Sequence, residues 1–185
     1  MKEQLMKAAH FVLSEKGLHF TMSDIAAAAK TSRKTVYHYF QNRDHLLETV
    51  IQESLSSLLD QTNSLLQQTD LDAKEKLVRF FQLKPLDSGN TEWIAIDLAD
   101  LKPYCWEKVL HFQQQRLLLM QNLLEQGIQN GLFRPCDTKI TAAIILRSYL
   151  DLHRSPFWRQ EQITKKEAFP AFIDFFLHGV CAVSQ

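Results

Sequence analysis

Apolar residues recur at steps of three and four positions through most of the chain, which is the pattern of helices with one buried face. The first such run covers Leu5–Leu13, and Gly17 is expected to end that helix. Thr21 stands three residues before Asp24 and resembles a capping box with Asp in place of the usual Glu. The pattern therefore predicts a second, short helix that continues to about Ala29.

Polar residues 30–32 interrupt the apolar pattern, which restarts at Val36 and Phe40. Two short helices are thus expected on either side of a tight turn, and the alanines that precede the turn let the helices approach closely. A fourth, long helix is expected to begin near Arg43 and to continue through Leu66. We expect it to connect an N-terminal head to the rest of the chain.

The remaining two thirds of the sequence also favour helices. They are expected over Ala73–Leu83, Thr91–Leu101, Trp106–Asn130, Thr138–Arg154 and Lys165–Val183. No stretch alternates apolar and polar residues as a strand would. The predicted fold class is therefore all-α, with a three-helix helix-turn-helix head at residues 1–46 and a larger helical body at residues 47–185.

Composition agrees with a globular protein, because 45% of the 185 residues are hydrophobic and 23% are charged. Total charge is zero, but the stretch Lys30–Arg43 holds four basic residues and no acid, which predicts a compact basic patch in the head. Three well-separated cysteines argue against a disulfide framework, and no apolar run reaches the roughly 18 residues of a membrane span. We therefore expect a cytoplasmic protein without membrane association.

The segment Thr21–Phe40, TMSDIAAAAKTSRKTVYHYF, fits a helix-turn-helix whose second helix enters the DNA major groove. Its most specific part is Ser32-x-x-Thr35-Val36-Tyr37-His38-Tyr39-Phe40, followed by Asn42-Arg43-Asp44 and Leu46-Leu47. With Glu15-Lys16-Gly17 and Ile25-Ala26 upstream, this run resembles the DNA-binding head of the TetR family of bacterial regulators. The body resembles that family in its helical pattern and in the loop Gly127-x-x-x-Gly131-x-Phe133-Arg134-Pro135.

The resemblance implies a sequence-specific transcriptional regulator and a set of residues that approach double-stranded DNA. That set is Thr31, Ser32, Arg33, Lys34, Thr35, Tyr37, His38, Tyr39 and Arg43. Arg33, Lys34 and His38 are expected to read bases, whereas Tyr37 and Arg43 are expected to bind phosphate. Lys30 stands where relatives often have glycine, so the turn is expected to need a positive φ that lysine adopts with difficulty.

The resemblance also implies a homodimer on a near-palindromic operator and a small-molecule effector of unknown identity, with repression as the family's commoner mode. Last-helix residues and their neighbours are expected at the dimer interface: Ile145, Tyr149, Phe169, Phe172 and Phe176. Middle-helix residues are expected to line an effector pocket: Trp93, Tyr104, Cys105, Trp106, His111 and Phe112. For both sets, simple burial in the core of the monomer is the alternative.

Two other functions compete with DNA binding. An enzyme is disfavoured because the seven histidines form no H-E-x-x-H pattern, no metal-ligand spacing is present and no glycine-rich phosphate loop occurs. We accordingly expect no catalytic residue, metal or cofactor. A helical interaction module that has lost DNA binding is the second alternative, and salt-dependent binding to duplex DNA distinguishes it from a regulator.

Overall fold

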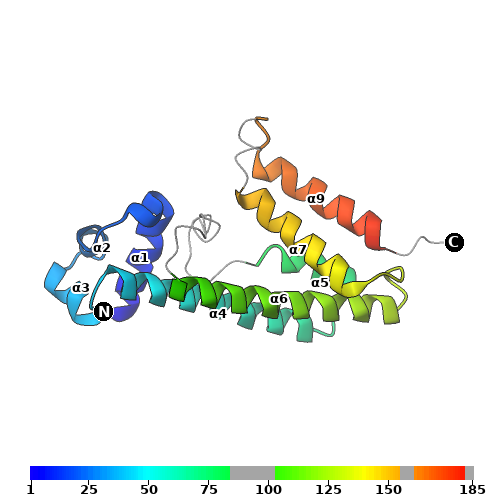
Figure 1. Cartoon of the computed structure of the whole chain (residues 1–185), viewed down its shortest axis with the longest axis horizontal. Helices are drawn as coiled ribbons and strands as arrows, with labels where there is room; N and C mark the ends of the chain where they lie inside the picture. Colours follow the sequence, from blue (N-terminus) through cyan, green and yellow to red (C-terminus); the bar gives the residue numbers. More distant parts are fainter. Residues whose placement is uncertain (84–102, 155–160, 182–185) are drawn as a thin grey trace. The chain divides into compact units, whose positions relative to one another are not determined.

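The computed structural model describes residues 1–83, 103–154 and 161–181, and these residues form eight α-helices and one short 3₁₀-helix (Figure 1). In order they are α1 (Lys2–Lys16), η1 (Gly17–His19), α2 (Met22–Ala28), α3 (Arg33–Tyr39), α4 (Arg43–Gln67), α5 (Ala73–Phe80), α6 (Pro103–Gln129), α7 (Thr138–Arg154) and α9 (Lys165–Val180). Only an isolated bridge between Phe133 and Cys181 has β geometry within these ranges. The predicted all-α class is confirmed, while the helix expected over Thr91–Leu101 lies outside the described residues.

The chain divides into two compact units, which we describe separately. The first contains Met1–Leu58 and Lys84–Val109, and the second contains Leu59–Leu83 and Leu110–Gln185. Helices α4 and α6 therefore each contribute residues to both units. Within the first unit, Lys108 on α6 pairs with Glu48 on α4 at 3.2 Å.

Local sequence signals set the helix ends in the first unit. Gly17 ends α1 with a positive φ of 55°, and its N–H donates to the carbonyl of Leu13. At the start of α2, the Thr21 hydroxyl accepts from the Asp24 N–H while the Asp24 carboxylate accepts from the Thr21 N–H at 2.7 Å. The predicted capping box is therefore present, and it fixes where α2 begins.

A continuous apolar core holds the first three helices and the start of α4 together. Its fully buried members come from all four elements: Leu5, Ala9, Leu13, Ile25, Val36, Leu46 and Val50. Phe40 is 1% exposed, so it is a core residue and not a DNA contact. Burial of these side chains leaves the polar face of α3 as the outer surface of the head.

The second unit packs α5, α6, α7 and α9 around a core of leucine and phenylalanine. Its fully buried side chains include Leu77, Phe80, Met120, Leu123, Leu124 and Ile145. Helices α7 and α9 run side by side (Figure 1). Tyr149 on α7 joins α5 by donating its hydroxyl to the carbonyl of Phe81 at 3.1 Å.

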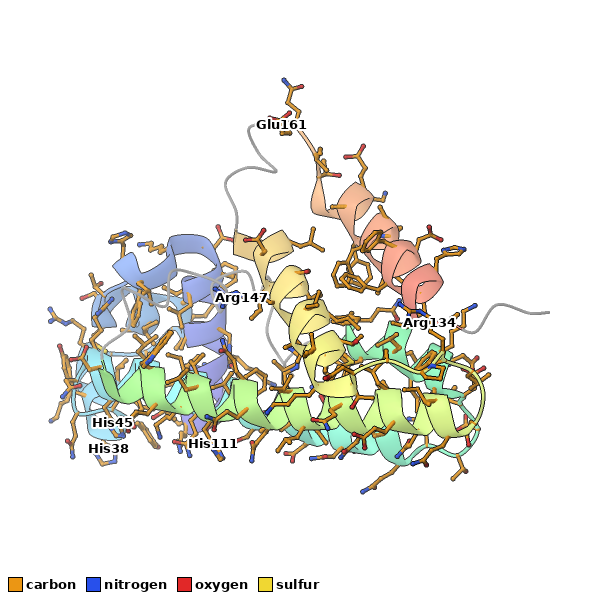
Figure 2. The ribbon with its side chains drawn as sticks, turned by 45° about the vertical axis from the view of Figure 1, so that its right-hand side comes forward. His38, His45, His111, Arg134, Arg147 and Glu161 are labelled. Atoms are coloured by element: carbon orange, nitrogen blue, oxygen red, sulfur yellow. The ribbon has the colours of Figure 1, made fainter. Side chains whose placement is uncertain are left out.

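Two glycines, Gly127 in the last turns of α6 and Gly131 in the loop that follows, are required by the local structure. Gly131 has a φ of 71°, in the left-handed region that favours glycine. A Cβ on Gly127 would lie 2.0 Å from Cδ2 of Phe133, whose ring is buried against the helix. Beyond the ring, Arg134 donates from Nε to the carbonyl of Gly179 at 2.6 Å and thereby ties the loop to the end of α9 (Figure 2).

Candidate nucleic-acid interface

The turn between α2 and α3 is built around a lysine in left-handed conformation. Lys30 has a φ of 51°, its N–H donates to Ala27, and the N–H of Thr31 donates to Ala26 at 2.9 Å. This pair of bonds is a Schellman motif, which normally carries glycine at the position that Lys30 occupies. The expectation of a positive φ at Lys30 is confirmed.

The Gln4 side chain holds the same turn from α1, because its Nε2 donates to the carbonyl of Ala29 at 2.8 Å. That carbonyl belongs to the last turn of α2 and has no partner within the helix. The first helix thus fixes the angle at which the chain leaves α2. It thereby positions the start of α3.

Helix α3 begins with a side-chain cap that sequence reasoning had assigned to DNA. The Ser32 hydroxyl accepts from the Thr35 N–H at 3.1 Å, and the two hydroxyl oxygens lie 2.9 Å apart. An N-cap of this kind stabilises a helix by about 1 kcal/mol, which matters for a helix of seven residues. Ser32 and Thr35 therefore have a structural role whether or not they also approach a phosphate.

One face of α3 is buried and the other is open. Val36 is fully buried, whereas Tyr37 and Tyr39 are 44% and 36% exposed. Arg33, Lys34 and His38 are also exposed, and His38 lies at the outer edge of the head (Figure 2). The three side chains expected to read bases thus share the open surface of one short helix, and Thr31 lies half-buried in the turn before it.

Acidic charge near this surface is neutralised. Asp24 is the acid of α2, and its carboxylate contacts Lys16 Nζ at 2.6 Å. The bond to Lys16, with those to the backbone and hydroxyl of Thr21, lowers the pKa of Asp24 from 3.8 to about 2. Since residues 25–42 contain no acid, the exposed side of α3 is a cationic surface that suits a polyanion.

Arg43 is engaged differently from the phosphate contact that the sequence suggested. Its Nε donates to the carbonyl of Phe20 at 3.1 Å, a terminal nitrogen donates to the carbonyl of Leu18, and its guanidinium lies 4.6 Å from the Phe20 ring. These contacts use the guanidinium to hold the segment between α1 and α2 against the start of α4. Arg43 thus supports the head, and its expected contact with phosphate stays a prediction.

Only part of the expected effector set falls among the described residues, so the effector pocket stays a prediction. Trp93 lies outside them, as do the side chains of Tyr104 and Cys105 at the start of α6. Trp106 is 38% exposed, and His111 is also exposed. Phe112 is buried, and its ring faces the Arg116 guanidinium at 5.6 Å.

The expected dimer residues divide between core and surface. Ile145 is 0% exposed because it faces the inside of its own unit, so its assignment to an interface is wrong. Phe172 is 8% exposed, while Tyr149, Phe169 and Phe176 are half-buried. The aromatic stripe therefore first serves the packing of α9 on α7.

An open groove of about 650 Å³ lies between α7 and α9 on the outside of that stripe. Phe175 projects there with 71% of its surface exposed, and Ile144 on α7 is 52% exposed. The groove is lined by Arg147, Ser148, Asp151, Leu152, Ile163, Glu167, Ala168, Ala171, Phe172, Phe175 and Phe176. The sequence analysis did not single out Phe175, although apolar residues on every side of this helix were a signal that one of its apolar faces is exposed.

Comparison with known proteins agrees with this picture. Residues 5–50 match the sequence model described as bacterial regulatory proteins, tetR family. An uncharacterized HTH-type transcriptional regulator of Bacillus subtilis, YvaF, is 23% identical, and the match covers 98% of this chain and 96% of that protein. Such relatives are named as transcriptional regulators and not as enzymes.

Two solved structures share the fold across nearly the whole chain. A putative transcriptional regulator from Saccharomonospora viridis in complex with choline has a TM-score of 0.83 at 18% identity, covering 98% of each chain. The regulator FadR from Bacillus subtilis in complex with stearoyl-CoA has a TM-score of 0.72 at 18% identity, covering 97% of this chain and 99% of that one. At these identities the likeness establishes the fold.

In the described part of this chain no helix has the length and apolar character needed to cross a bilayer.

Proposed function

On the premise that this chain is a transcriptional regulator of the tetR family with a helix-turn-helix DNA-binding head, we propose that it acts as a homodimeric repressor on a near-palindromic operator, from which a small molecule releases it. The observation that carries the DNA-binding part is the open cationic face of α3, which follows a capped and rigid turn. The repressor mode follows from the resemblance to the family, in which repression is the commoner mode.

The proposed division of labour on α3 follows from exposure and chemistry. Arg33 and Lys34 begin the helix and remain exposed, so they can donate to guanine O6 and N7 in a major groove. His38 stands one turn further along the same helix and is the third proposed base reader. Tyr37 has a hydroxyl suited to a phosphate oxygen, and we assign it to positioning.

Five other expected contacts have supporting roles in the proposal. Ser32 and Thr35 cap and brace the start of α3, so their hydroxyls reach DNA only at the backbone. Thr31 lies half-buried in the turn before α3, and its hydroxyl is assigned to the same kind of contact. Tyr39 packs edge-on to His38 with 5.1 Å between ring centroids and orients the imidazole. Arg43 acts at one remove, because its guanidinium is bonded to two carbonyls of the head.

Dimerisation is proposed through α7 and α9. A single head reads a short half-site, and a two-fold dimer places two heads about 34–36 Å apart or a multiple of that distance. The groove beside Phe175 offers apolar surface with charged residues at its edge, namely Arg147, Asp151 and Glu167. This composition is that of an interface with an apolar centre and a polar rim.

Release by a small molecule is proposed to act through α4, which has residues in both compact units. An effector changes DNA affinity only if it binds the DNA-incompetent arrangement more tightly than the competent one. Two regulators that share this fold, from S. viridis and B. subtilis, were solved with choline and with stearoyl-CoA. Support for a small-molecule effector therefore comes from the shared fold alone. The division at residues 46 and 47 and the cytoplasmic location likewise stay predictions.

The test compares duplex DNA binding by wild type and two variants. Arg33→Ala should reduce the preference for the selected operator over altered sites by about 1–3 kcal/mol, because one base contact is lost. Lys7→Ala, an exposed cation on α1, is the matched control and should leave that preference unchanged. If wild type binds no duplex with a steep salt dependence, the interaction-module alternative replaces this proposal.

A further inference from the structure

The second unit contains a half-buried arginine beside aromatic rings. Arg116 lies on α6, and its guanidinium carbon is 4.5 Å from the centre of the Phe80 ring and 5.6 Å from that of Phe112. The Tyr149 ring lies 6.0 Å away. Three rings from α5, α6 and α7 thus lie around one cationic group of the unit.

The hydrogen-bonding capacity of this arginine is not used up by the residues around it. Its Nε is buried and has no acceptor in the described part of the chain. The Tyr149 hydroxyl, the nearest polar group among the rings, donates to the carbonyl of Phe81 instead. Arginine is a donor only, so an orphaned Nε is a group whose partner is missing.

No carboxylate compensates its charge among the described residues. Glu125 is the acid on α6 within this unit, and it accepts from Gln121 at 2.9 Å and from Thr138 at 3.1 Å. Nine residues separate Glu125 from Arg116, which is about 13 Å along a helix. The acid therefore serves the junction of α6 and α7.

Burial without a counter-charge is unfavourable for this group. Desolvation lowers the pKa of Arg116 from 12.5 to about 10, so the side chain still carries its charge at neutral pH. The faces of the three rings stabilise a cation in part. They offer no acceptor to Nε, however, and a buried cation is otherwise found paired or bound to an anion.

We propose that Arg116 binds the anionic head of the effector, a carboxylate or a phosphate, and that the surrounding rings contact an apolar body attached to that head. The guanidinium fork matches both kinds of head through two parallel hydrogen bonds. Phe81, Tyr149 and Phe172 extend the aromatic surface beyond the arginine, with ring centroids 4.7–6.0 Å apart. An anion with a hydrocarbon or aromatic body satisfies both features.

This inference names the ligand class for the effector site and so rests on the proposed function. Its test measures the affinity of the full-length protein for three probes with the same tail: decanoate, decyl phosphate and decan-1-ol. We expect at least one anionic probe to bind about tenfold or more tightly than the alcohol, because the charged head gains the arginine. The better of the two anions identifies the head. Equal affinity for all three probes, or binding of none, overturns the proposal.

Two variants test whether Arg116 is the residue responsible. Arg116→Met should abolish the preference for the anion, whereas Lys139→Met, which removes an exposed cation of α7, should preserve it. Arg116→Lys replaces the methionine variant in the test if Arg116→Met does not unfold cooperatively and so is not properly folded. The lysine variant should bind the anion more weakly and keep a reduced preference for it. An anion preference that survives unchanged in Arg116→Lys and Arg116→Met contradicts the proposal and leaves the arginine a purely structural residue.

Operator binding by the same proteins separates this inference from the proposed function. Without probe, Arg116→Met should bind the operator as wild type does, since the residue lies outside the head. Arg116-dependent anion binding in a protein that binds no DNA would refute the regulator and retain the anion site. Operator binding without any anion preference would refute the anion site alone.

Discussion

At the scale of single residues, Lys30 shows that the turn between α2 and α3 holds a non-glycine residue in the unfavourable left-handed conformation. A left-handed φ costs an ordinary residue about 1–2 kcal/mol, yet the Schellman bonds and Gln4 require it at this position. The positive φ was predictable because the family that the head resembles often carries glycine at this position. The hydrogen bonds of the Arg43 guanidinium were not predictable, because they join it to the backbone carbonyls of residues more than 20 positions away.

Replacing Lys30 with glycine should raise the free energy of unfolding by about 0.5–1 kcal/mol, because glycine adopts this φ without strain. Chemical denaturation measures the change. The same substitution at Lys7, in the middle of α1, should lower stability by about 1 kcal/mol. Lower stability in Lys30→Gly as well would show that the turn carries no strain.

The ionisation of Asp24 makes the stability of the head depend on pH. Because its pKa falls to about 2 in the folded protein, the charged carboxylate contributes stability above about pH 4, and that contribution is lost as pH falls from 3.8 toward 2. Carboxyl-carbon NMR titration measures the pKa directly. Lys16→Ala removes the largest cause and should raise it; an unchanged value in that variant would assign the effect to Thr21 instead.

At the scale of elements, the sequence predicted most helices to within a few residues. Predicted and observed bounds of Thr138–Arg154 coincide, and α5 ends three residues before the expected Leu83. The start of α6 was placed at Trp106 because Pro103 was interpreted as a break, whereas proline is well suited to the first position of a helix. Periodicity shows that a helix has an apolar face, but it does not show whether that face packs inside the monomer or against a second copy. Ile145 was misassigned for that reason.

The contact between Gly127 on α6 and the Phe133 ring offers a sharp test of packing. Gly127→Ala should destabilise the second unit by about 1–3 kcal/mol, because the added methyl group overlaps the buried Phe133 ring. Gly179→Ala is the matched control: its Cβ meets no atom within 4 Å, and alanine favours a helix. Thermal unfolding of both variants decides the point, and equal stability of Gly127→Ala and wild type would mean that the ring moves aside without cost.

At the scale of the whole molecule, function is proposed to depend on two surfaces that lie on different compact units. The cationic face of α3 belongs to the first unit and the groove between α7 and α9 to the second. The sequence indicated the first surface well, since capping residues, basic residues and hydroxyls lie within twenty consecutive positions. It indicated the second poorly, because both the core side and the outer side of α9 are aromatic.

If the protein dimerises through this groove, a substitution at the interface should lower its molecular mass in solution. Phe175→Asp places a charge at the centre of the proposed interface and should give a monomer, while the fold is kept because this side chain is 71% exposed. Lys166→Asp, an exposed change at the start of α9, should leave the dimer intact. Sedimentation of the three proteins at equal concentration measures this, and a dimer in Phe175→Asp would move the interface elsewhere.

The most direct test of a dimeric regulator with this head is selection of bound sequences from a pool of random duplexes. The account predicts enrichment of one near-palindrome whose half-sites are related by two-fold symmetry, bound with an affinity that falls steeply as salt rises. It also predicts that Arg33→Ala loses base preference within each half-site. Enrichment of no sequence, or of a single unrepeated half-site, would contradict it.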